Sequence, residues 1–243
     1  MGKEVKSLGL RPGRGAALIA KLGGRFSVEL GIDLTAGGSR EIFKWFLAAM
    51  LFGARISETI AVKTYREFEK ERINTAREIL KRGWDAIVAV LDRGGYVRYD
   101  FSTATKLLAV SEALVTRYGG NLNALQAAAL DPRDLELKLK ALGKGIGDVT
   151  TNIFLRELRG IWPRADPLPS ELVITAAKDL GLLPERLNDK RRALQLLRTG
   201  WTRERGSAKQ FADFEAALVR HGLAIRRKHA ALSRGAKAGA LVT

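Results

Sequence analysis

The sequence predicts an all-α protein of two helical lobes, and three observations lead to this prediction. Apolar residues recur at the spacing of amphipathic helices through nearly all of the 243 residues. No window alternates apolar and polar residues between Asn-Gly or Asp-Gly turns, which is the pattern of paired strands. Three prolines fall between Pro163 and Pro169, and a helix interior does not accept them. We expect this segment to cross between a central lobe, residues 46–160, and a second lobe formed by residues 1–45 and 161–243.

Start and stop signals divide the two lobes into individual helices. Ser39 precedes a dense apolar run and is a candidate N-cap, and Ser57 begins the next helix. Glycines follow several of the apolar runs, and Asp131 and Pro132 open a helix with proline at its first position. The expected helices cover residues 42–51, 57–68, 73–81, 84–91, 102–117, 122–129, 131–142, a segment that starts near 148, and 171–180.

The charge of the chain is the most informative part of its composition. Lys and Arg number 42 against 26 Asp and Glu, which gives a net charge of +16. A globular protein this basic usually binds a polyanion, because the release of condensed counterions favours association with nucleic acid. Residues 183–243 hold fourteen Lys and Arg against five acids, more than half of the net charge. They predict a basic C-terminal face against phosphates, with a merely solvated helix as the alternative.

Several classes of protein and cofactor are excluded by what the sequence lacks. Without cysteine there is no disulfide framework and no iron–sulfur cluster. His221 and His229 have no partners at ligand spacing, and no phosphate-binding glycine motif is present, so we expect neither a metal nor a cofactor. No run of 18 apolar residues and no signal peptide is found, so we expect a cytoplasmic protein, nucleoid-associated in a prokaryote, that makes no membrane contact.

The most specific local pattern is a glycine-rich turn between two expected helices. One helix ends at Leu142 and the next starts near Asp148. Glycines in the turn let backbone N–H groups approach a phosphate, and the N-terminus of the following helix adds its positive dipole end. Such contacts position a duplex without reading its bases. An ordinary αα-hairpin has the same spacing and is the alternative. The expected phosphate-binding residues are Gly143, Lys144, Gly145, Ile146 (pointing inward) and Gly147.

The segment from Leu142 to Thr151 resembles the helix-hairpin-helix of the DNA glycosylase superfamily, which includes endonuclease III and the 3-methyladenine glycosylases of the AlkA type. The family pattern is leucine, Gly-(Val/Ile)-Gly, two residues and Thr-Ala, and this chain has Gly-Ile-Gly-Asp-Val-Thr-Thr. Weaker resemblance extends over about residues 40–185. The resemblance implies a DNA-binding cleft between the two lobes and a monomer that flips a damaged base out of double-stranded DNA in base excision repair.

The family's catalytic groups are carried over only in part. The lysine that forms a Schiff base in bifunctional members corresponds to Val149, so the resemblance implies a monofunctional enzyme. The family's acid stabilises the positive charge that develops on the sugar. Alignment on the Leu-Pro pair at 168–169 places Glu171 there, and Asp166 is the other candidate. The resemblance leaves two hypotheses: a monofunctional DNA glycosylase, or a non-catalytic helix-hairpin-helix DNA-binding protein that has lost the acid.

Other residues are placed at the DNA by the same resemblance. Arg55 corresponds to the residue that fills the gap left by the flipped base, with a plain surface arginine as the alternative. Four aromatic residues either stack a flipped base or belong to the core. They are Trp45, Phe46, Tyr96 and Tyr99. In the family, hairpin carbonyls hold a monovalent cation, and the matching positions are Ala141, Gly143 and Ile146.

Overall fold

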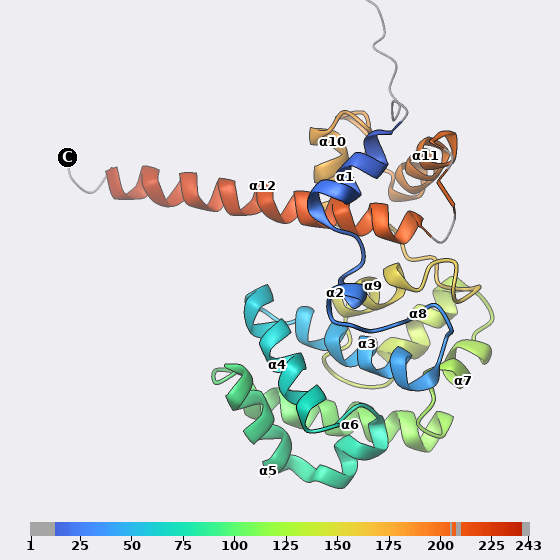
Figure 1. The fold of residues 1–243 in the computed structure, drawn as a ribbon, viewed down its shortest axis with the longest axis vertical. Helices are drawn as coiled ribbons and strands as arrows, with labels where there is room; N and C mark the ends of the chain where they lie inside the picture. The colour runs from blue at the N-terminus through green and yellow to red at the C-terminus, as the bar shows by residue number, and fades with distance from the viewer. Residues whose placement is uncertain (1–12, 205, 208–209, 240–243) are drawn as a thin grey trace, which may run out of the picture. The chain divides into compact units, whose positions relative to one another are not determined.

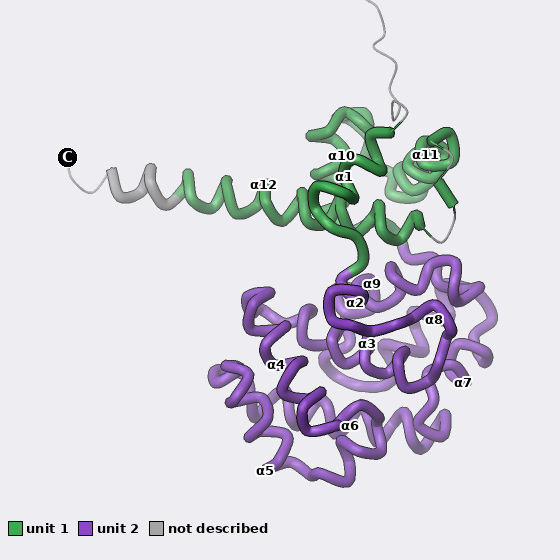
Figure 2. The backbone as a smooth tube through the Cα atoms, viewed as in Figure 1, with its two compact units in different colours: residues 1–25, 168–243 green, residues 26–167 purple. Residues whose placement is uncertain are grey.

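The computed structural model describes residues 13–204, 206–207 and 210–239, with side chains up to 233. Within these ranges the chain is helical and contains no strand, which confirms the all-α prediction (Figure 1). Two compact units are present (Figure 2). Unit 2 is residues 26–167, and unit 1 combines the chain up to residue 25 with the chain from residue 168 onward.

The observed division follows contacts that the sequence does not reveal. Unit 2 begins at residue 26 and ends at 167, whereas the expected central lobe covers residues 46–160. Glu157 explains the earlier start, because its carboxylate accepts hydrogen bonds from the backbone N–H groups of Phe26 (2.8 Å) and Ser27 (2.9 Å). The indole of Trp45 donates to the carbonyl of Phe154 at 3.0 Å. Residues 26–45 therefore contact residues 154–157, which the sequence predicts to lie in the central lobe, and they belong to unit 2.

Side-chain caps begin several of the helices of unit 2. The side chains of Ser57, Thr75 and Asp131 each cap the helix that follows, and Pro132 is the first residue of its helix, as expected. Ser39 is not an N-cap: it is the first helical residue, and Gly38 precedes it. The helices are α2 (Phe26–Glu29), α3 (Ser39–Phe52), α4 (Glu58–Lys70), α5 (Ala76–Gly94), α6 (Asp100–Tyr118), α7 (Leu122–Ala127), α8 (Pro132–Lys140) and α9 (Asp148–Glu157).

Two glycines decide where helices of unit 2 bend or stop. The expected helices over 73–81 and 84–91 form one element, α5, which is interrupted at Gly83 by a non-helical backbone (φ 77°, ψ 175°). Helix α6 ends at Gly119, whose φ of 63° lies in the left-handed region that favours glycine. The sequence predicts that a helix ends at each of these two glycines. This is confirmed at Gly119, whereas at Gly83 the helix is interrupted and continues as part of α5.

The core of unit 2 contains most of the aromatic residues considered as base-stacking groups. Trp45, Phe46 and Tyr96 are buried, so they are core residues and do not line a site for a base. Phe46 packs edge-on against Phe154, with ring centroids 5.1 Å apart. Tyr99 is half-buried, and the guanidinium of Arg98 lies over its ring. Burial raises the pKa of Tyr96 to about 12, which keeps its hydroxyl protonated.

Unit 1 joins the N-terminal helix to the C-terminal ones. Its helices are α1 (Arg14–Leu22), α10 (Glu171–Asp179), α11 (Lys190–Arg203) and α12 (Phe211–Gly239). The backbone N–H of Gly15 donates to both carboxylate oxygens of Glu204, at 2.9 and 3.1 Å. Arg25 pairs with Asp213 at 3.2 Å. These contacts hold α1 against the chain that follows residue 200, so unit 1 is discontinuous in sequence.

Helix α12 has two different halves. Residues 211–219 pack into unit 1, and the backbone of Leu172 in α10 lies against Gly222. From Ala224 onward the helix extends past the other helices of unit 1 (Figure 1). No helix within the described ranges is both long and apolar enough to cross a membrane.

Candidate functional site

The turn between α8 and α9 is the feature around which the candidate site is built. Helix α8 ends at Lys140 and α9 begins at Asp148, within two residues of the predicted bounds. Ile146 is buried, as predicted, whereas Lys144, Gly145 and Gly147 are exposed. The buried isoleucine fixes the turn to unit 2 and leaves the backbone on either side of it facing solvent.

The two exposed glycines of the turn have different roles. Gly145 has φ +109°, a conformation that other residues rarely adopt. Gly147 is extended (φ −96°, ψ −171°), and a Cβ atom there would meet nothing within 4 Å. A positive φ is therefore a feature of Gly145 and not of Gly147. What Gly147 provides is open space in front of α9, and as the N-cap residue it offers no side-chain acceptor to the first amide groups of that helix.

Helix α6 supports the turn from behind and adds two cations to it. A Cβ atom at Gly143 would lie 3.1 Å from Val110, so the turn packs directly on α6. The stem of Lys106 covers Gly145, with its Cδ 2.9 Å from where a Cβ would be. Arg117, three helical turns further along α6, donates to the carbonyl of Ala141 at 2.8 Å. Lys106 and Arg117 could not be predicted as site residues, because nothing in the spacing of the turn points to α6.

The loop that carries Arg55 lies beside the same turn. The backbone of Gly53, directly after α3, approaches the side chain of Thr150 so closely that a Cβ atom there would clash with it. Thr150 in turn donates to the carbonyl of Gly145 at 3.4 Å. Arg55 is exposed two residues beyond Gly53. The structure therefore places Arg55 and the glycine turn, which are far apart in the sequence, on neighbouring segments of unit 2.

Acidic groups also lie at this site. Asp148 is the first residue of α9, its side chain is 91% exposed, and it is paired with Lys140. Glu136 of α8 is half-buried, and burial raises its pKa, with the nearby charge of Asp148 adding to the increase and Lys140 acting against it. A negative charge at the start of α9 is stabilised by the helix dipole but repels a phosphate. The turn is thus a basic site that its own carboxylate partly balances.

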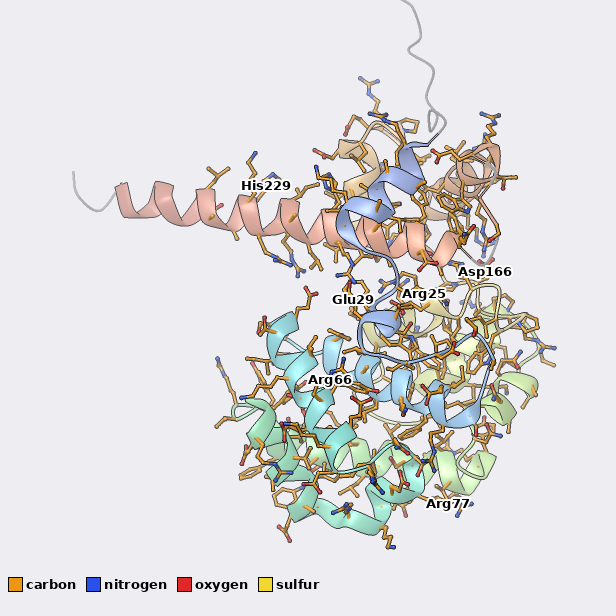
Figure 3. The ribbon with its side chains drawn as sticks, viewed as in Figure 1. Arg25, Glu29, Arg66, Arg77, Asp166 and His229 are labelled. Carbon is orange, nitrogen blue, oxygen red and sulfur yellow. The ribbon has the colours of Figure 1, made fainter. Side chains whose placement is uncertain are left out.

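Asp166 lies at the end of unit 2, close in sequence to α9 (Figure 3). Its carboxylate is paired with Arg159, a buried arginine that also donates to the carbonyl of Pro167. The side chain of Asp166 is 37% exposed. This geometry holds the carboxylate in one orientation and sets a positive charge beside it.

Glu171 is in a different environment, in unit 1. It is the first residue of α10, which Ser170 caps through its hydroxyl. Its side chain is 78% exposed and is paired with Lys190 at 2.6 Å. An exposed, ion-paired carboxylate does not match the buried group that stabilisation of a sugar cation requires.

The remaining residues singled out in the sequence are Val149, His221 and His229. Val149 is 62% exposed on the first turn of α9 and carries no nucleophile. His221 is paired with Asp179 at 2.7 Å, and His229 is exposed. Within the described ranges, no group of three or more His, Cys, Asp or Glu residues is arranged to hold a metal ion.

The carbonyls considered for a monovalent cation do not fit one. The guanidinium of Arg117 donates to the carbonyl of Ala141, and the N–H of Ile146 donates to the carbonyl of Gly143 at 3.3 Å. A cation on these oxygens would lie beside the positive charge of Arg117. We derive no role for such an ion.

Comparison with known proteins adds no family to this description. No protein-family model matches the chain, and no curated protein is significantly similar to it.

Proposed function

We propose that this chain binds double-stranded DNA through the turn between α8 and α9 and excises a damaged base by hydrolysing its N-glycosidic bond. It would act as a monomer in the compartment that holds the DNA, which is the cytoplasm in a prokaryote. One observation carries the proposal: an exposed glycine turn, fixed by a buried isoleucine, leads directly into the N-terminus of α9, whose N-cap residue is Gly147. This arrangement offers several backbone N–H groups to one phosphate.

The surroundings of the turn support duplex DNA as the partner. Lys106, Lys144 and Arg117 provide positive charge around the same backbone groups. Arg55 lies on the adjacent loop, where its planar guanidinium suits the space and the unpaired base that a flipped nucleotide leaves behind. Backbone contacts of this kind hold a duplex without reading its sequence.

In the proposed reaction the bond between C1′ of the deoxyribose and the base nitrogen breaks. Water adds its hydroxyl group to C1′, and its remaining proton goes to the departing base, which leaves an abasic site. Positive charge develops on the sugar as the bond breaks, so a fixed carboxylate nearby lowers the barrier. Asp166 suits this role better than Glu171, because a buried arginine orients it and Glu171 is largely exposed. Because Val149 carries no amine, we expect hydrolysis of the N-glycosidic bond without cleavage of the DNA strand.

The DNA-binding part of the proposal is tested by filling the space in front of α9. Gly147→Val places a branched side chain where the phosphate would approach, without backbone strain. Gly38→Val is the matched control, because Gly38 also precedes a helix (α3), has a negative φ and has open space around it. We expect Gly147→Val to weaken binding to unrelated duplexes about tenfold or more, and Gly38→Val to bind like the parent protein. Equal affinities of the two variants would contradict the proposal.

The excision part is tested separately by base release. The parent protein, Asp166→Asn and Glu171→Gln are incubated with duplexes that carry alkylated, deaminated or oxidised bases. We expect release of at least one damaged base by the parent protein, a loss of about a hundredfold or more in Asp166→Asn, and little change in Glu171→Gln. A loss in Glu171→Gln alone would move the role to that residue. If both variants still release the damaged base, neither carboxylate stabilises the sugar cation.

A non-catalytic DNA-binding protein is the second candidate, and the ion pairs favour it. Arg159 lies beside Asp166 and Lys190 beside Glu171, so each candidate carboxylate already faces a cation. A balanced carboxylate stabilises a sugar cation less than an unpaired one. Duplex binding that depends on Gly147, with no base released from any lesion by the parent protein, is the result that would support this candidate.

A further inference from the structure

The exposed half of α12 is a second basic surface, and it belongs to unit 1. Arg226, Arg227 and Lys228 are all exposed. His229, one residue further on, is exposed as well (Figure 3). These residues lie beyond Gly222, against which the backbone of Leu172 in α10 packs, and beyond the half-buried Leu223 and Ile225. The basic residues therefore lie on the part of α12 that extends past the other helices of unit 1.

The charged residues in the C-terminal part of the chain are all basic. No Asp or Glu occurs after Glu215, whereas six Lys and Arg do: Arg220, Arg226, Arg227, Lys228, Arg234 and Lys237. Elsewhere in the chain acidic residues lie among the basic ones, and ion pairs such as that of Lys190 with Glu171 and that of Arg93 with Glu71 form. An extended helix without acids creates a positive potential over several turns, which is the electrostatic complement of a polyanion.

We propose that the exposed half of α12, centred on Arg226, Arg227 and Lys228, is a second contact with the phosphate backbone of duplex DNA. This inference rests on the proposed function and extends it to unit 1. Its mode differs from that of the turn in unit 2, because side-chain cations rather than backbone amides meet the phosphates. Each cation that neutralises a phosphate releases counterions, so this contact strengthens binding chiefly at low salt.

A membrane surface fits this helix less well than DNA does. Three consecutive basic residues span about 200° of the helix circumference, since each residue turns the helix by about 100°. Among the described side chains of this part of α12, the large apolar ones are the half-buried Ile225 and the exposed Leu232, and two are too few for the wide apolar face of an interfacial helix. The surrounding residues are mainly alanines, which offer little area for burial in lipid.

The test is the salt dependence of duplex binding by the full chain. One variant replaces Arg226, Arg227 and Lys228 by alanine. The matched control replaces Lys190, Arg191 and Arg192 of α11, which has the same composition and the same change in net charge. In the control segment Lys190 is paired with Glu171, and Asp189 caps the helix. We expect the slope of log Kd against log salt to become shallower by about 2 to 3 in the α12 variant and by less than about 1 in the control.

Three results would overturn the inference. One is an unchanged slope in the α12 variant. Another is an equal loss of slope in both triple variants, which would show an effect of net charge alone. The third is binding to phosphatidylserine vesicles that needs the α12 triplet while duplex binding does not, which would assign the helix to membranes.

The same series separates this inference from the proposed function. If the α12 variant keeps its slope while Gly147→Val still weakens binding, only the second contact is wrong. If the α12 variant loses slope while Gly147→Val binds normally, the role of the turn is wrong and the α12 contact stands. If the parent protein does not bind duplex DNA at all, both proposals fail.

Discussion

The glycine turn of unit 2 and the exposed half of α12 in unit 1 are both basic surfaces, but they are built in opposite ways. The turn is supported on several sides: Ile146 is buried beneath it, Val110 packs behind it, and Gly53 approaches its neighbour Thr150. In the exposed half of α12, residues 226–233 are all exposed. The turn offers backbone groups in a fixed geometry, whereas α12 offers side-chain charges on long flexible stems.

This difference has consequences for how each surface tolerates change. A turn that depends on close packing and on one positive φ is sensitive to single substitutions in its support, because buried contacts and strained backbone each contribute kilocalories. An exposed basic helix is sensitive to the number of its charges and insensitive to their exact placement.

The largest effect is expected where α9 is anchored. Glu157→Ala leaves two backbone N–H groups and the buried Arg156 without their carboxylate, so we expect the free energy of unfolding to fall by about 3 kcal/mol at mildly acidic pH. Alanine at Arg226, Arg227 and Lys228 together should change it by less than about 0.5 kcal/mol, because these side chains are exposed. Chemical denaturation of both variants measures the difference, and equal losses would contradict it.

The effect of Glu157 also has a predicted pH dependence. Burial raises the pKa of Glu157 above its ordinary value, so the folded protein binds this proton more tightly than the unfolded chain does. The stability that the group contributes is complete below its ordinary pKa and is lost as the pH rises through the raised value. The difference in the free energy of unfolding between the parent protein and Glu157→Ala should therefore decrease from mildly acidic to alkaline pH. A difference that increases over this range would show that the pKa of Glu157 is shifted in the opposite direction.

The next effect concerns the strained glycine of the turn. Gly145→Ala forces a residue with a side chain to hold φ +109° and pushes the stem of Lys106 away. We expect a loss of about 1 to 3 kcal/mol in the free energy of unfolding, together with weaker duplex binding. Gly147→Val should bind weakly without losing this stability, because its backbone is extended and its surroundings are open. Equal stability of Gly145→Ala and the parent protein would show that the turn relaxes.

A smaller effect, of opposite sign, is expected at Asp148. Asp148→Asn removes a negative charge from the first residue of α9 and frees Lys140 from its ion pair. Both changes favour a phosphate in front of the helix, so affinity for duplex DNA should rise about two- to fivefold at low salt. Titration of the variant against several duplexes measures this. Weaker binding would indicate that the phosphate does not approach α9 from its N-terminus.

The smallest effect is expected from the identity of the salt cation. Because Arg117 already donates to the carbonyl of Ala141, the turn should not need a bound monovalent ion. Replacement of K⁺ by Na⁺ or choline at constant ionic strength should change duplex affinity by less than about twofold. A large preference for one ion would mean that a cation displaces the guanidinium.

The sequence predicts this fold well where the signals are local. Asp131 and Pro132 mark the start of α8, and Gly119 marks the end of α6, because caps and positive φ values depend on neighbouring residues. The turn between α8 and α9 was located for the same reason. Ser39 shows the limit of local signals: a serine before an apolar run can be the first helical residue when a glycine takes the cap position.

The candidate site was less predictable, because its support comes from distant segments. Nothing in the spacing around Gly145 indicates that Lys106 covers it, or that Gly53 brings the loop of Arg55 alongside. The environments of Asp166 and Glu171 depend on Arg159 and Lys190, and sequence cannot show which charges pair. An aromatic residue such as Trp45 likewise cannot be assigned to core or site before its burial is known.

The most direct test of the account compares salt titrations of duplex binding by the parent protein, Gly147→Val and the alanine triplet at 226–228. We expect two different responses. Gly147→Val should weaken binding at every salt concentration and change the slope of log Kd against log salt by less than about 1, because backbone amides are neutral. The triplet should make that slope shallower by about 2 to 3, because it removes cations. Parallel losses of slope in both variants, or unchanged binding by Gly147→Val, would contradict the account.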